Sequence, residues 1–186
     1  MTSYWSADAN SDIMLMVAQA MQNWHKDLNQ HNIRVGVVFA LGSDPDKPVV
    51  KSSGYPAIAN VRLIKGKDRA FKSHEVEILV DASIWRKLNS ESKLAVVDHE
   101  LAHVAIKKKK VKKKKNETSP SEQADDKPPE EEVVLDDRGR PVLRLKKGDW
   151  NVGDGFKDVV SRHGQNAVEY SNIKSAEQMV NEAMAS

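Results

Sequence analysis

Apolar residues near the start of the chain recur with the period of a helix. Within residues 11–28 they fall at steps of three and four, which places them on one helical face: Ile13, Met16, Val17, Ala20, Met21, Trp24 and Leu28. Ser11 or Asp12 stands where the cap of such a helix is expected. The pattern therefore predicts an N-terminal helix that packs this face against a core.

Three later segments have the pattern of strands. Residues 33–41 are rich in β-branched side chains and are bounded by polar turn signals, and residues 59–65 and 74–80 are two further candidates. In the last of these, apolar and acidic residues alternate, so we expect Glu75 and Glu77 to face outward.

A second helix is expected from Ser90 onward, with Ser90 or Ser92 as its cap. Its buried stripe would consist of Leu94, Val97, Leu101 and Val104.

The composition changes abruptly after this helix. The run that begins at Lys107 and ends at Lys115 has eight lysines in nine positions, and residues rich in Pro, Ser and acidic side chains follow it. Like charges at helical spacing repel one another, and this composition cannot form a packed core. We therefore expect one domain made of residues 1–106 and 133–186, with residues 107–132 as a disordered insertion.

Order is expected to return in residues 133–145, where two apolar runs flank a Gly-containing turn in the manner of a β-hairpin. Asp154 is then placed to cap a short helix that ends at His163, with Gly164 as its C′ residue. The apolar side of that helix would consist of Phe156, Val159 and Val160. Residues 175–184 form a last amphipathic stretch.

Composition narrows the chemistry that the chain can support. The 186 residues include no cysteine, which excludes disulfides, thiolate zinc sites, iron–sulfur clusters and cysteine nucleophiles. Any metal must therefore be held by His, Asp or Glu. No apolar run approaches the roughly 20 residues that a membrane-spanning helix requires. The N-terminus also lacks the pattern of a secretory signal, so we expect a protein of the cytosol with no membrane contact.

The second helix carries a His-Glu-x-x-His motif at His99, Glu100 and His103. Positions i and i+4 lie one above the other on a helix, so both imidazoles can reach one metal ion at about 2.0–2.1 Å. Glu100 lies about 100° further around the helix than His99, where it can hold a water without ligating the metal. The alternative is an ordinary surface helix on which these three side chains are merely solvated.

This arrangement indicates peptide-bond hydrolysis with Zn²⁺ as the cofactor. Zinc lowers the pKa of a bound water from about 15.7 toward 7 and polarises the carbonyl that the water attacks. Glu100 would act as the general base and would return the proton to the leaving amine.

Two stretches around the motif resemble a known family. Residues 76–88, Val-Glu-Ile-Leu-Val-Asp-Ala-Ser-Ile-Trp-Arg-Lys-Leu, and residues 95–104, Ala-Val-Val-Asp-His-Glu-Leu-Ala-His-Val, are similar to the phage metallopeptidases, a zincin-like group of phage and prophage genomes. The resemblance implies an α+β fold, a minimal zincin-like domain. In it a small mixed sheet with a hairpin packs on the N-terminal helix and the motif helix. It also implies a phage or prophage protein in the cytoplasm of a bacterial host.

A catalytic zinc site needs a third protein ligand, which the motif does not supply. Asp154 is the candidate by position, with Asp149 as its neighbour. His163 is the better ligand chemically, although a histidine at a helix C-terminus commonly serves the helix dipole. Members of the family carry a His-Asp pair near this point, where this chain has Gly148 and Asp149. The third ligand is therefore Asp154 or His163.

Several other residues receive simpler interpretations. His25, His31 and His74 have no motif spacing and are expected at the surface. Asp98 is either a carboxylate that orients a ligand histidine or a plain surface aspartate. In zincin-like folds an edge strand aligns an extended substrate, and residues 75–80 are the candidate for that strand.

The leading hypothesis is a zinc metallopeptidase that acts on a protein or peptide substrate. The alternative is a zincin-shaped module without catalysis that binds nucleic acid or protein through its lysine-rich loop. The run from Lys107 to Lys115 could contact phosphates weakly and without sequence preference. A solvated loop, partly neutralised by the acidic residues within 117–137, is the favoured interpretation of that run.

Overall fold

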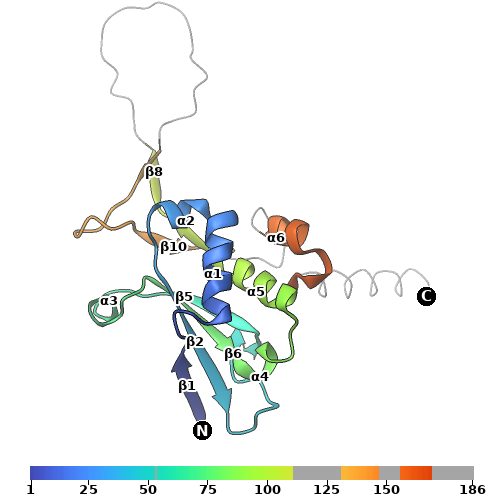
Figure 1. The fold of residues 1–186 in the computed structure, drawn as a ribbon. Coiled ribbons are helices and arrows are strands. Elements are labelled where there is room, and N and C mark those ends of the chain that lie inside the picture. Colours follow the sequence, from blue (N-terminus) through green and yellow to red (C-terminus); the bar gives the residue numbers. More distant parts are fainter. Residues whose placement is uncertain (53, 111–130, 147–155, 169–186) are drawn as a thin grey trace, which may run out of the picture.

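The structure is a computed structural model that describes residues 1–52, 54–110, 131–146 and 156–168 (Figure 1). Its main sheet has the strand order β1-β2-β6-β5. These strands are β1 Thr2–Ser6, β2 Val35–Gly42, β5 Ala59–Leu63 and β6 Val76–Asp81. β2 and β6 run parallel, with Val37 opposite Ile78, whereas β1 and β5 are antiparallel to their neighbours. The expected α+β class and the small mixed sheet are confirmed.

Two sheet features differ from the prediction. β1 was not expected, since Thr2–Ser6 has no alternating apolar pattern; it pairs with β2, and Trp5 stacks on Phe39 with ring centroids 5.6 Å apart. β6 is not an edge strand, because β2 and β5 flank it on both sides. The prediction that residues 75–80 offer a free edge to a substrate is therefore wrong, and the edge strands of this sheet are β1 and β5.

Helices α1 Asp12–Asn23 and α5 Ser90–Ala102 pack together with the sheet, and α6 Phe156–His163 packs on α5 (Figure 1). The apolar face of α1 enters the core as predicted, with Ile13, Val17, Ala20 and Met21 all buried. The predicted helix is interrupted, however: a second helix, α2 Lys26–Gln30, begins after a break at Trp24 and His25. Leu28 on α2 is still fully buried.

Side chains, rather than the backbone alone, set the helix boundaries near the motif. α5 is capped by Asn89, whose side-chain oxygen accepts from Ser92 N at 2.7 Å, and not by Ser90 or Ser92 as predicted. Asp81 caps the short helix α4 Ala82–Trp85 by accepting from Ser83 N and Ile84 N. α6 ends at His163 and Gly164 follows with φ +52°, as the sequence predicts.

Glu75, just before β6, and Glu77, on β6, are both buried, which contradicts the outward placement predicted for them. Glu75 is 7% exposed and Glu77 is 2% exposed. Glu77 is covered by the cationic side chains of Arg62 and Lys72 and by His74. Burial alone would raise the pKa of Glu77, but the hydrogen bonds from Lys72 and Arg62 outweigh it and hold the pKa below its ordinary value. Alternation in sequence could not reveal these partners.

The chain after α5 forms two short ladders in place of a simple hairpin. β7 Val104–Ile106 pairs with β10 Leu143–Leu145, and β8 Lys108–Lys110 pairs with β9 Glu131–Val133. Residues 134–142 do turn back on themselves, since Leu135 bridges Pro141. Lys108–Lys110 and residues 131 and 132, near the two ends of the expected insertion, therefore lie in a ladder. Residues 111–130 and 175–184 lie outside the described residues, and the predictions made for them stay predictions.

The remaining elements are small. They are the two-stranded pair β3 Lys51–Ser52 and β4 Tyr55–Pro56, the short helix α3 Asp68–Phe71, and the 3-10 turn Gly164–Asn166. Within the described part of the chain, every helix is too short or too polar to cross a membrane.

Candidate metal centre

The His-Glu-x-x-His motif lies at the C-terminal end of α5. His99 is in the last turn, and His103 directly follows the helix with helical backbone angles, φ −68° and ψ −20°. Leu101, between them, is fully buried and anchors this turn in the core. Both histidines therefore remain on consecutive turns of one helical path, which the i, i+4 spacing requires.

The two imidazoles face each other. His99 Nε2 lies 3.2 Å from His103 Nε2, and the ring centroids are 4.9 Å apart with an interplanar angle of 81°. Two nitrogen ligands at 2.0–2.1 Å from a tetrahedral zinc ion would be separated by about 3.3 Å. The separation of these nitrogens therefore fits a pair of zinc ligands.

Contacts with Lys146 orient the His103 ring. His103 Nδ1 lies 3.3 Å from the carbonyl oxygen of Lys146, and Lys146 N donates to the His103 carbonyl at 2.7 Å. A carbonyl oxygen can only accept, so this contact places the ring proton on Nδ1. Nε2 of His103 then keeps its lone pair and can bind a metal.

Glu100 is 6% exposed, so its carboxyl lies at the edge of the core and not on an open helix surface. The interpretation of this turn as an ordinary solvated surface does not fit this burial. His99 and His103 are partly buried.

Asp98, immediately before the motif, is fully buried and joins three elements. It accepts from His25 Nε2 at 2.7 Å, from Arg162 Nη1 at 2.9 Å to each oxygen, and from His163 Nε2 at 3.0 Å. We call these four residues the Asp98 cluster. Burial would raise the pKa of Asp98, but the hydrogen bonds and charges of His25 and Arg162 outweigh it and hold the pKa below its ordinary value.

The Asp98 cluster contains residues that the sequence did not single out. His25 was expected at the surface, which is wrong: it is 8% exposed and lies at the break between α1 and α2. His25 and Arg162 are 73 and 64 positions from Asp98, so no local spacing connects them. Asp98 is buried, so its interpretation as a plain surface aspartate is wrong. Asp98 does bind two histidines, His25 and His163, although neither belongs to the His-Glu-x-x-His motif.

Of the candidate third ligands, only His163 lies within the described residues. His163 Nε2 points at Asp98, and its ring meets Trp24 edge-on with centroids 4.9 Å apart. Asp154 and Asp149 lie outside the described residues. Among the residues that the structure does describe, no three His, Asp or Glu side chains gather in a way that could hold a metal ion. The described chain thus supplies two converging imidazoles, and Asp154 or His163 as the third ligand stays a prediction.

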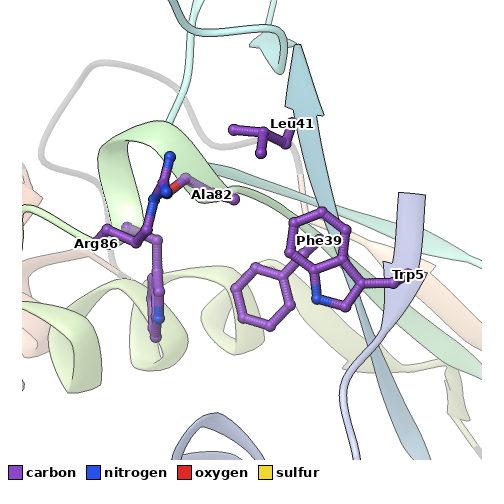
Figure 2. A pocket seen from close by; sticks show the side chains of 6 residues that line it. Trp5, Phe39, Leu41, Ala82 and Arg86 are labelled. Carbon is purple, nitrogen blue, oxygen red and sulfur yellow. The ribbon is translucent and has the colours of Figure 1, made fainter. Parts of the chain in front are cut away.

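A separate apolar cavity of about 420 Å³ opens between β1, β2 and α4 (Figure 2). Its lining residues are Trp5, Phe39, Leu41, Ala82, Trp85 and Arg86. Because none of them belongs to the motif or to the Asp98 cluster, this cavity is distinct from the candidate metal centre.

A comparison with protein families gives one result for nearly the whole chain. A family model described as "Putative phage metallopeptidase" matches residues 6–183. No curated protein and no solved structure matches the chain.

Proposed function

This chain belongs to the phage metallopeptidase family, and we propose that it is a zinc-dependent peptidase in which His99 and His103 hold the ion and Glu100 is the general base. Membership of the family supports a metallopeptidase, and hence a protein or peptide substrate. The choice of zinc, the residue roles and the zincin-like character of the domain are our proposal.

The observation that carries the proposal is the 3.2 Å separation of the two Nε2 atoms. An i, i+4 histidine pair on a helix surface has no need to converge, because each ring can be hydrated separately. Here the rings converge, and the contact of Nδ1 with the Lys146 carbonyl favours the tautomer of His103 that carries its lone pair on Nε2. Together these features favour a shared cation over two solvated side chains.

The chemistry then divides between the ion and the protein. When bound, zinc supplies a Lewis acid that activates water and polarises a substrate carbonyl. Glu100, next to the first ligand in the chain, would accept a proton from the attacking water and pass it to the leaving amine. Its low exposure favours this role, because a carboxylate shielded from bulk water interacts more strongly with the groups it faces.

We propose Asp154 as the third ligand in preference to His163. The Nε2 atom of His163 is already engaged by the buried Asp98, so ligation through it would break that hydrogen bond. Asp154 lies just before α6 in the chain, as Asp149 does.

Metal analysis of the purified full-length chain tests the ligand assignment. We expect about one zinc per chain after dialysis against a weak chelator, and loss of that zinc in His99→Ala and in His103→Ala. His31→Ala is the matched control, because the His31 side chain hydrogen-bonds only the Asp27 carbonyl among the residues described. The same measurement on Asp154→Ala, Asp149→Ala and His163→Ala identifies the third ligand.

Peptide hydrolysis tests the catalytic role. Glu100→Gln should retain zinc and lose cleavage of an unfolded protein substrate by at least about 100-fold, the usual contribution of a general base. A wild-type chain that takes up no zinc, or a Glu100→Gln variant that cleaves as fast as wild type, would remove the basis of the proposal.

A further inference from the structure

A second polar site lies away from the motif, between α3 and the turn at residues 136–140. It is a cavity of about 270 Å³ lined by Gly66, Arg69, Ala70, Asp136, Arg138 and Arg140. Figure 1 shows α3 and the orange segment that precedes β10 on the same side of the sheet. Three of the six lining residues are arginines, and they come from segments almost 70 positions apart. Arginines carry the same charge and repel one another, so the groups that neutralise them have to be identified.

Arg69 is only partly neutralised by the protein. Its side chain is 17% exposed, with Nη1 3.3 Å from Asp136 Oδ2 and Nη2 3.8 Å from Glu75 Oε1. Both Nε and Nη2 are buried and lack a hydrogen-bond acceptor in the part of the chain that is described. Buried donors are nearly always satisfied in folded proteins, so an unsatisfied guanidinium beside a cavity calls for an acceptor from outside.

The two carboxylates near Arg69 are shared with other arginines. Glu75 accepts from Arg34 Nη2 at 2.8 Å and from Arg34 N at 2.9 Å. Asp136 accepts from Arg140 Nε at 3.0 Å and also from backbone N–H groups of its own turn. The guanidinium groups of Arg34, Arg69 and Arg140 therefore share two buried or half-buried carboxylates, and Arg138 adds a further positive charge.

Hydrogen bonds within its own turn hold Asp136 in its ionised form. The backbone N–H and side chain of Arg140 lower the pKa of Asp136 to about 2. Asp136 is therefore ionised at neutral pH, and its single negative charge is shared between Arg69 and Arg140.

Arg138 is presented without a partner of its own. It is exposed, its backbone N donates to Asp136 Oδ1 at 2.9 Å, and it makes no ion pair with any residue in the described ranges. The following Gly139 has φ +71°, which closes the turn and holds Arg138 at the cavity. Its guanidinium is thus free to meet a ligand.

We propose that this cavity binds a phosphate group, either free or in the backbone of a nucleic acid. A tetrahedral phosphate has oxygens on several sides and can accept from arginines of two different segments at once, whereas one guanidinium fork already satisfies a carboxylate. Lys107, the first residue of the lysine run, is hydrogen-bonded to the segment that follows this turn, since its N donates to the Val142 carbonyl at 2.8 Å. Added positive charge there would assist a phosphate polymer more than a single ion.

Calorimetric titration of the full-length chain with inorganic phosphate is the first test. We expect saturable binding that Arg138→Ala weakens by roughly ten-fold, the effect of losing one hydrogen bond to a charged group. Arg144→Ala is the matched control: Arg144 is exposed on β10, has no ion pair within the described chain and does not line the cavity. That variant loses the same charge and should bind phosphate as wild type does.

A labelled DNA oligonucleotide distinguishes the two sources of phosphate. Binding that falls in Arg138→Ala, and that inorganic phosphate displaces, identifies the nucleic-acid backbone. Binding of phosphate without binding of the oligonucleotide identifies a free phosphate or a small phosphate ester. The proposal is overturned by an absence of phosphate binding, by equal losses in Arg138→Ala and Arg144→Ala, or by a glutamate-rich peptide that binds through Arg138 and is not displaced by phosphate.

Discussion

Replacement of Asp98 by asparagine tests the Asp98 cluster most directly, because the two side chains have the same shape and differ in charge. The carboxylate is fully buried, while the side chains of Arg162, His25 and His163 are 25%, 10% and 7% exposed. Asparagine offers one acceptor oxygen where four donor contacts now converge.

The expected loss of stability follows from these contacts. Removing one partner of a buried, hydrogen-bonded ion pair costs about 3–5 kcal/mol. Arg162 is 25% exposed, so water recovers part of its solvation and the lower end of that range applies. The asparagine amide group then faces a donor, which adds about 1 kcal/mol. We therefore expect Asp98→Asn to lower the free energy of unfolding by about 4 kcal/mol and the Tm by on the order of 10 °C.

Urea denaturation at pH 7 in the presence of EDTA measures this effect without a contribution from bound metal. Asp158→Asn is the matched control, since Asp158 contacts the same Arg162 at 3.7 Å but is 66% exposed. An exposed pair of this kind contributes less than about 1 kcal/mol. If Asp98→Asn is no more destabilising than Asp158→Asn, the Asp98 cluster does not hold α5 to α1 and α6 as described.

Three further predictions concern other parts of the structure. Because the pKa of Asp136 is lowered to about 2, its stabilising contribution is present above the ordinary carboxyl pKa and is lost as the pH falls through about 2; an NMR titration should show this pKa rising toward its ordinary value in Arg140→Ala. Gly164→Ala should destabilise the chain by about 1–2 kcal/mol in urea denaturation, because Gly164 has φ +52°. Leu101→Ala should lower the free energy of unfolding by about 2–5 kcal/mol in the same assay, whereas Leu15→Ala, at a position 60% exposed, should change it far less.

Features encoded by neighbouring residues could be predicted from the sequence. The short helix that ends at His163 was predicted with its end and its C′ glycine because both signals are local. The i, i+4 spacing likewise predicts that the rings of His99 and His103 can meet, and their Nε2 atoms are 3.2 Å apart.

Features that depend on distant partners could not be predicted. The burial of Glu77 requires cations from β5 and from the segment before β6, and the burial of His25 requires a carboxylate on α5. The position of β6 inside the sheet depends on its pairing with β2 and β5, which alternation within one strand does not specify. A third ligand for the metal that we propose at His99 and His103 would be a problem of the same kind, because it would come from a segment with no fixed spacing to the motif.

The β8–β9 ladder has a practical consequence for engineering. Lys110 lies opposite Glu131, so the ladder holds the two ends of the twenty-residue segment 111–130 next to each other. When the ends of a segment are held in this way, changing its length alters the closure entropy slowly, by about 0.6 kcal/mol for each doubling. This junction can therefore be shortened to a tight turn, or can carry a fluorescent reporter or affinity tag, while the helix that bears His99 and His103 keeps its own anchors.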